Sequence, residues 1–149
     1  MARRGALGVG GFTLVEVVVV LGILVVLTAV SLPVLARHNH TRVLDAAARQ
    51  LASEFRELQQ MARTRRVSCQ VTFDETRDTY TVSIGGTQVK GSVEIPGGVR
   101  LEADFAGDDP AVAVFDAMGR ANGGVVTLTS PGGTRRVHVE RAATIYIEK

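Results

Sequence analysis

The sequence predicts an α+β protein in which a long N-terminal helix packs on an antiparallel β-rich domain. Residues 12–35 form an almost unbroken apolar run, and the apolar residues that follow recur at helical spacing. From residue 67 onwards, apolar and polar residues alternate in short segments separated by turn sequences. A helix followed by a series of strands is typical of the α+β class. We therefore divide the chain into four segments: a leader at 1–11, a transmembrane helix at 12–36, its amphipathic continuation at 37–66 and a globular domain at 67–149.

The apolar run has the length of a membrane-spanning helix. Its 24 residues correspond to about 36 Å of α-helix, and about 20 apolar residues suffice to cross a bilayer. Arg3 and Arg4 precede it, so the positive-inside rule places the N-terminus in the cytoplasm. The alternative is a secretory signal cleaved after Val34-Leu35-Ala36, although the run is longer than the usual apolar region of such signals. A mature protein beginning at Arg37 would support that alternative.

Two residues within the run are unusual for a membrane helix. Glu16 places a carboxylate near its start, and a charge at the bilayer centre costs roughly 2.5–3.5 kcal/mol on insertion scales. Pro33 removes a helix hydrogen bond and clashes with the preceding turn, so we expect a bend near Val30.

Residues 10–16 read Gly-Gly-Phe-Thr-Leu-Val-Glu, which resembles the type III signal of type IV pilins and type II secretion pseudopilins. The resemblance implies that a prepilin peptidase/methyltransferase cuts between Gly11 and Phe12 and N-methylates Phe12. It also implies that Glu16 pairs with the Phe12 amine of a neighbouring subunit, and it matches Pro33 to the kinking proline of the family. Such a pair offsets the cost of two buried charges only when the subunits are in register. The alternative is a Glu16 that stays hydrated near the membrane interface.

The amphipathic continuation presents one apolar face. Its apolar residues are spaced by seven, four, three and four: Leu44, Leu51, Phe55, Leu58 and Ala62. We expect one helix from residue 12 to about residue 64, with this stripe packed on a sheet. His38 and His40 point to different helix faces, so we interpret them as solvated histidines and not as a metal site.

The globular domain reads as a series of antiparallel strands. Val67, Cys69, Val71 and Phe73 alternate with polar residues, as do Tyr80, Val82 and Ile84, and the turn-rich connector between them predicts a hairpin. Further strands are expected at 92–95, 99–105, 112–115, 125–129, 135–140 and 144–148, separated by Pro-, Gly- and Asp-rich turns.

A second resemblance covers residues 115–128, which read Phe-Asp-Ala-Met-Gly-Arg-Ala-Asn-Gly-Gly-Val-Val-Thr-Leu. This stretch and the strand after it are similar to the C-terminal domain shared by H-type pseudopilins and the related T-type minor pilins. Gly119, Gly123 and Gly124 suit turns or bulges that need positive φ. We therefore interpret the motif as scaffold and not as a site.

No residue pattern indicates catalysis or a cofactor. Cys69 alternates with buried positions and is expected in the core, and as the single cysteine it can form no intrachain disulfide. Four aspartates could in principle bind calcium, although their spacing matches no calcium loop: Asp104, Asp108, Asp109 and Asp116. We predict no metal, no cofactor and no enzymatic activity.

The number of arginines suggests that the protein could bind nucleic acid. The chain has 17 Lys+Arg and 15 Asp+Glu, and without Arg3 and Arg4 the two counts are equal, so binding would need a local patch. The resemblance to DNA-binding T-type minor pilins makes Arg135, Arg136 and Arg141 the candidates. Those proteins have a glycine-arginine motif where residues 141–147 here read Arg-Ala-Ala-Thr-Ile-Tyr-Ile. Solvated arginines on an outer face, including the cluster at Arg63, Arg65 and Arg66, are the alternative.

These resemblances imply a minor pseudopilin, a structural subunit of the periplasmic pseudopilus of a type II secretion system. Its partners would be the prepilin peptidase, other pilins or pseudopilins, and the inner membrane. It would cross that membrane once, with the N-terminus cytoplasmic before processing and the C-terminal domain periplasmic. One alternative is a minor type IV pilus subunit that serves pilus assembly or DNA uptake. Another is a solitary membrane-anchored periplasmic binding module.

Overall fold

The computed structural model describes residues 13–142 and 144–148, and within helix α1 the side chains of residues 30–38 are not described. The chain forms two compact units, Met1–Ala36 and Arg37–Lys149. The Gly11–Phe12 junction lies outside the described residues. Pro33 lies among the undescribed side chains, so the bend expected there stays a prediction.

Helix α1 spans Leu14–Arg65, close to the limits expected from the sequence. Thr13 caps its start, because its hydroxyl accepts the N–H of Glu16 at 3.2 Å and its carbonyl accepts the N–H of Val17 at 3.2 Å. Arg66, with φ of 53°, has the left-handed conformation that commonly ends a helix. In the described part of the chain, no helix has the length and apolar character needed to cross a membrane.

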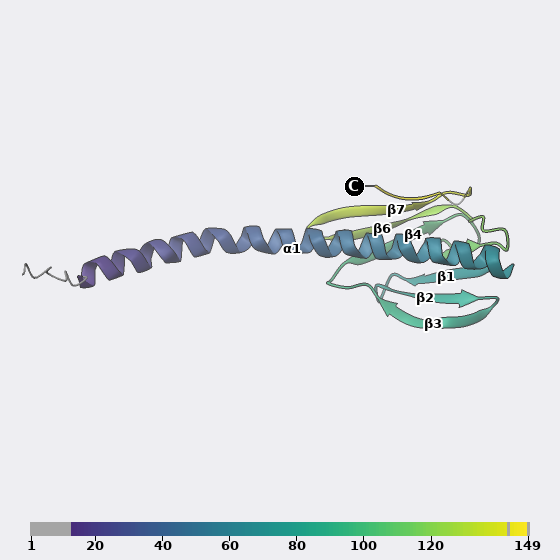
Figure 1. Cartoon of the computed structure of the whole chain (residues 1–149), viewed down its shortest axis with the longest axis horizontal. Helices are drawn as coiled ribbons and strands as arrows, with labels where there is room; N and C mark the ends of the chain where they lie inside the picture. Colours follow the sequence, from purple (N-terminus) through teal and green to yellow (C-terminus); the bar gives the residue numbers. More distant parts are fainter. Residues whose placement is uncertain (1–12, 143, 149) are drawn as a thin grey trace, which may run out of the picture. The chain divides into compact units, whose positions relative to one another are not determined.

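Within the residues that the structure describes, eight antiparallel strands form two four-stranded sheets (Figure 1). The first has the order β3-β2-β1-β5 and the second the order β4-β6-β7-β8. The strands are β1 (Cys69–Asp74), β2 (Thr79–Ile84), β3 (Thr87–Glu94), β4 (Arg100–Phe105), β5 (Val112–Phe115), β6 (Gly124–Ser130), β7 (Gly133–Val139) and β8 (Ile145–Glu148). The predicted α+β architecture, with a helix packed on antiparallel sheets, is confirmed.

Strand β3 begins at Thr87, whereas the sequence predicted a strand from Ser92. The two-residue turn Gly85-Gly86 joins it directly to β2, since Ile84 pairs with Thr87. Nearly all side chains of β3 are exposed, and the strand lies at the edge of its sheet. It therefore has no buried face, and its sequence shows no alternation from which the early start could be predicted.

The amphipathic stripe of α1 forms the core with both sheets. All five predicted stripe residues are buried, as is Cys69. The ring of Phe55 lies 6.2 Å from Phe73 on β1, 6.3 Å from Phe105 on β4 and 5.9 Å from Phe115 on β5, measured between centroids. A single helical side chain thus contacts aromatic rings from both sheets.

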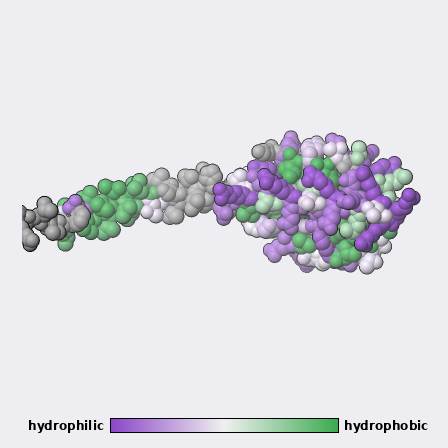
Figure 2. Space-filling view, viewed as in Figure 1, coloured by the Kyte–Doolittle hydropathy of each residue, from purple (hydrophilic) through white to green (hydrophobic). Residues whose placement is uncertain are grey.

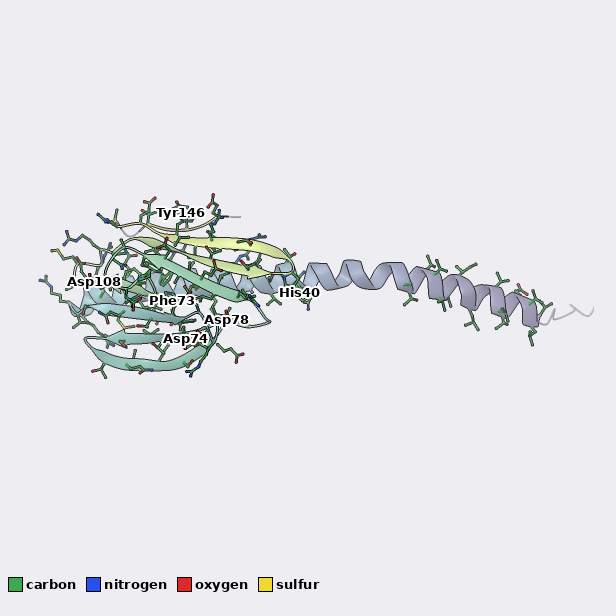
Figure 3. The ribbon with its side chains drawn as sticks, turned by 180° about the vertical axis from the view of Figure 1, so that it is seen from behind. His40, Phe73, Asp74, Asp78, Asp108 and Tyr146 are labelled. Atoms are coloured by element: carbon green, nitrogen blue, oxygen red, sulfur yellow. The ribbon has the colours of Figure 1, made fainter. Side chains whose placement is uncertain are left out.

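The β1–β2 turn covers the free edge of β4, which is the first strand of the second sheet. Asp78 Oδ1 accepts the N–H of Leu101 at 2.9 Å, and Glu75 Oε1 accepts the N–H of Ala103 at 2.8 Å. Figure 3 shows Asp74 and Asp78 at this turn. These bonds satisfy strand N–H groups that would otherwise be open to another chain.

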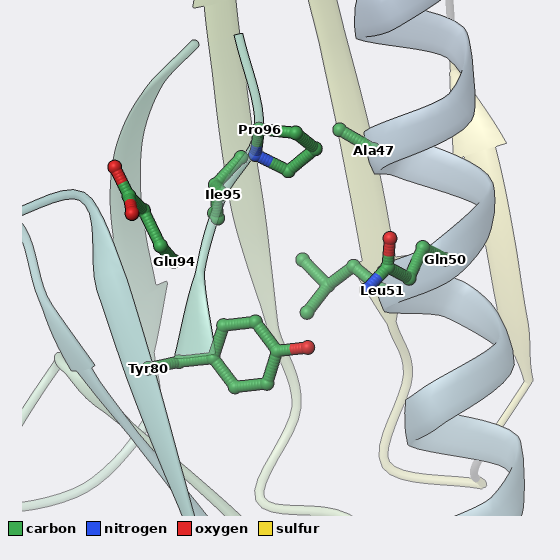
Figure 4. A pocket seen from close by; sticks show the side chains of 7 residues that line it. All are labelled: Ala47, Gln50, Leu51, Tyr80, Glu94, Ile95 and Pro96. Carbon is green, nitrogen blue, oxygen red and sulfur yellow. The ribbon is translucent and has the colours of Figure 1, made fainter. Parts of the chain in front are cut away.

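A buried carboxylate links α1 to the first sheet. Glu54, only 9% exposed, accepts hydrogen bonds from the Tyr80 hydroxyl at 2.8 Å and from the Lys90 ammonium. Figure 4 shows Tyr80 beside a small crevice between α1 and the loop at Ile95 and Pro96. Burial raises the pKa of the Tyr80 hydroxyl well above its usual range, and the hydrogen bond to Glu54 adds to this. The hydrogen bond to Glu54 is also the main cause of a raised pKa for Lys90.

The Glu54→Leu substitution should lower the free energy of unfolding by about 1–3 kcal/mol, because it leaves the buried Tyr80 hydroxyl without an acceptor. Adding Tyr80→Phe should recover most of that loss, since the buried hydroxyl is then gone as well and the remaining partner, Lys90, is half-exposed. Denaturant unfolding of the two variants checks this. A double variant less stable than Glu54→Leu would contradict the account.

Alkaline pH should destabilise the unit Arg37–Lys149, here called the head, in part through Tyr80. Its folded pKa is raised, so its contribution to stability is complete below the unfolded tyrosine pKa of about 10 and is lost as pH rises beyond it. The melting temperature should therefore fall less steeply between about pH 9 and pH 11 in Tyr80→Phe than in the parent chain. Equal slopes would show that Tyr80 loses its proton as easily folded as unfolded.

Candidate functional site

The first half of α1 exposes an apolar surface. Among the described residues, all but three of the large hydrophobic side chains that are exposed lie between Leu14 and Leu27. Figure 2 shows this segment as a continuous apolar surface. A helix that is apolar on every side is normally buried in lipid or among other helices. This segment therefore exposes an apolar surface of a kind that is normally covered.

Glu16 is the one acidic residue in the first turn of this helix. Its backbone N–H is held by the Thr13 hydroxyl, and its side chain lines a shallow groove with Val17, Val20 and Leu21. A carboxylate at this end is favoured by the helix dipole. Thr13 was not singled out in the sequence, although Thr-x-x-Glu before an apolar run is a helix-capping signal that could have identified it.

The three arginines considered for nucleic acid do not form one patch. Arg135 Nε donates to Asp45 Oδ1 on α1 at 2.7 Å, and its side chain is only 14% exposed. Arg136 follows on the opposite face of β7, with its Nη1 3.9 Å from Glu148 Oε2. Arg141 lies exposed in the turn after β7. Nucleic-acid binding through these residues stays a prediction.

The motif at 115–128 builds a turn that docks on α1. Asp116 Oδ1 accepts the N–H groups of Met118 at 2.9 Å and Arg120 at 2.8 Å, and its Oδ2 accepts Arg120 Nε at 2.9 Å. The Arg120 backbone N–H is the main cause of a lowered Asp116 pKa. Gly119 has φ of 75°, and a Cβ there would collide with the Arg63 side chain.

Asn122 joins strand β5 of the first sheet to the loop after β4 of the second. Its Oδ1 accepts the N–H of Val114 at 3.0 Å, and its Nδ2 donates to the carbonyls of Ala106 at 2.8 Å and Val112 at 2.9 Å. The sequence did not reveal this role, because the partners lie eight to sixteen residues away. The motif therefore positions loops, in agreement with its interpretation as scaffold.

The other residues with chemical potential are dispersed. Cys69 is fully buried, and burial raises the pKa of its thiol. Asp109 and Asp116 accept backbone N–H groups within their own turns, and Asp108 lies at the surface (Figure 3). His40 is half-buried, whereas the side chain of His38 is not described. In the described ranges, no three His, Cys, Asp or Glu side chains converge to hold a metal ion.

Comparison with known folds identifies similar solved structures. The minor pseudopilin EpsH from the type II secretion system of Vibrio cholerae has a TM-score of 0.59 at 13% identity over 70% of this chain and 95% of that one. A second EpsH structure gives 0.57 at 12% identity over 72% and 97%. The type IV minor pilin FimU of Pseudomonas aeruginosa gives 0.57 at 13% identity over 71% and 88%. These likenesses establish a shared fold.

Sequence comparison places the head in a family. A search of curated proteins gives no significant match. Residues 47–143 match the family model described as type II transport protein GspH, which agrees with the resemblance to H-type pseudopilins noted in the sequence. The match covers well over half of the chain, from the amphipathic half of α1 to the turn before β8. The chain therefore belongs to the GspH family of type II transport proteins, within the type IV pilin and pseudopilin superfamily.

Proposed function

We propose that this protein is a minor pseudopilin, a structural subunit of the periplasmic pseudopilus of a type II secretion system. The observation that carries the proposal is the apolar surface of the first half of α1, with its single carboxylate Glu16, on a chain whose head belongs to the GspH family. A filament of such helices would supply the apolar environment that this surface needs.

Before assembly, residues 12–35 would hold the subunit in the inner membrane, with the head in the periplasm. Prepilin peptidase would remove the leader between Gly11 and Phe12 and methylate the new N-terminus. The support for this step is the sequence at residues 10–16 and the basic residues Arg3 and Arg4.

Glu16 would then set the register between neighbouring helices. Its carboxylate lies among Val17, Val20 and Leu21, where an unpaired charge loses favourable solvation when the helix is buried. The amine of Phe12 on a neighbour offsets that loss only at one axial position. Thr13 fixes the start of the helix and so the height of the carboxylate along it.

A minor type IV pilus subunit is the alternative, because the FimU and EpsH folds resemble this chain almost equally. Gene deletion separates the two. Loss of exoprotein release with normal twitching and transformation supports the pseudopilin, and the reverse pattern supports the pilus subunit. A solitary membrane-anchored binding module would show neither loss and no dependence on Glu16.

Processing gives a direct test of the N-terminus. When the full chain is produced with a prepilin peptidase, mass spectrometry should find a mature protein that starts at N-methylated Phe12. Gly11→Val should block the cut, and Gly8→Val, a glycine outside the junction, serves as the control. A mature chain starting at Arg37 would show a cleaved secretory signal and overturn the proposal.

Assembly should depend on Glu16. Glu16→Ala should reach the membrane at the normal level, because it removes a charge from an apolar segment. Its share of cross-linked filament should nevertheless fall by about tenfold, the effect of losing roughly 1.4 kcal/mol per contact. Glu102→Ala, which removes an exposed carboxylate of β4, is the matched control. Normal assembly of Glu16→Ala would refute the register role.

A further inference from the structure

A shallow cleft lies between the end of β5 and the turn after β7, on the head and outside the apolar helix surface. Its lining combines two arginines and an aspartate with small and aliphatic side chains. Its lining residues are Val114, Asp116, Arg120, Ala121, Asn122 and Arg141. None of the residues in the cleft is needed for the processing or register steps proposed above.

Arg141 is held in place at this cleft, and among the described residues its charge has no partner. Its carbonyl accepts the N–H of Ala121 at 3.3 Å. Its aliphatic stem passes over Gly123, where a Cβ would lie 2.9 Å from Arg141 Cγ. In the described part of the chain, its guanidinium forms no hydrogen bond or ion pair. An arginine whose stem is positioned and whose head is unpaired is prepared to bind an anion.

The second arginine of the cleft, Arg120, already forms an ion pair with Asp116. Arg120 Nε donates to Asp116 Oδ2, and the other oxygen of Asp116 accepts two backbone N–H groups. The charges of Arg120 and Asp116 therefore offset each other, and Arg141 leaves the cleft with a surplus of one positive charge. This surplus matches a single carboxylate better than a polyphosphate backbone, which needs several cations.

The apolar lining of the cleft favours a ligand that also has an apolar group. Ala121 is buried and Val114 is half-buried, so an aliphatic side chain placed against them would lose water-exposed surface. The charge of Arg141 and the apolar residues Val114 and Ala121 together favour a ligand with a carboxylate next to an aliphatic group. A protein segment with Glu or Asp beside Leu, Ile or Val has this chemistry.

We infer that the cleft docks an acidic segment of a second protein chain, with a carboxylate on Arg141 and the adjacent aliphatic side chain on Val114 and Ala121. If the proposed function is right, that second chain is a neighbouring subunit of the filament. Only this identification of the chain rests on the proposed function. The docking chemistry itself follows from the head alone.

The test is a titration of the full chain in detergent micelles, observed by NMR at the Ala121 and Asn122 amides and the arginine side chains. The probe is the blocked dipeptide acetyl-Leu-Glu-amide. We expect saturable shifts at the cleft with a dissociation constant on the order of 1–10 mM. Acetyl-Leu-Gln-amide, which lacks the charge, and acetyl-Ser-Glu-amide, which lacks the aliphatic group, should each bind about fivefold more weakly.

Arg141→Gln should weaken binding of acetyl-Leu-Glu-amide by about fivefold and leave the fold unchanged. Arg136→Gln is the matched control, because Arg136 is exposed on β7 but lies near Glu148. Three outcomes would each overturn the inference. They are equal binding of the charged and neutral probes, an Arg141→Gln titration that does not differ from the parent chain, and tighter binding of a thymidine oligonucleotide at Arg141. The titration does not depend on Glu16 or on leader removal, so its failure is distinguishable from failure of the proposed function.

Discussion

The packing of Phe55 between the two sheets is the interaction on which the head depends. Each sheet has one apolar face, and the two faces are held to the same helix through the rings of Phe73, Phe105 and Phe115. The head is therefore built around the second half of α1. Polar contacts on either side of the apolar stripe fix the helix further, through Glu54 with the first sheet and through Asp45 with Arg135 of the second.

The same helix has a first half with an opposite property. From Leu14 to Leu27 its large apolar side chains are exposed. One continuous helix thus has an apolar stripe that is buried against the sheets and an apolar segment that is exposed. Burial of the exposed segment in lipid or against other subunits would be favourable. Under the proposed function, this division separates the half of α1 that packs on the sheets from the half that would contact other subunits.

Much of this could be predicted from the sequence, because periodicity reports which side of an element is buried. The five stripe residues of α1 and the buried positions of β1 followed from spacing alone. Periodicity does not report which strands pair, so the division into two sheets was not predicted. The early part of β3 was missed because an exposed edge strand needs no alternation.

The residues that position the candidate sites were harder to find, because most of them act across long sequence distances. Asp45 and Arg135 are ninety residues apart, and neither has a local pattern that indicates the other. Asn122 and Arg141 reach their partners only when the connection after β5 meets the loop after β4 and the turn after β7. Thr13 is the exception, since its capping role has a local sequence signal.

The central claim is that the apolar half of α1 binds the same half of other subunits, with Glu16 setting the register. The most direct measurement is photo-cross-linking in intact cells from a reactive residue at Val17, which lines the groove beside Glu16. The account predicts adducts with the N-terminal peptide of another subunit, beginning at residue 12, and their loss when Glu16 is replaced by Ala. Adducts with lipid alone, unchanged by that replacement, would contradict it.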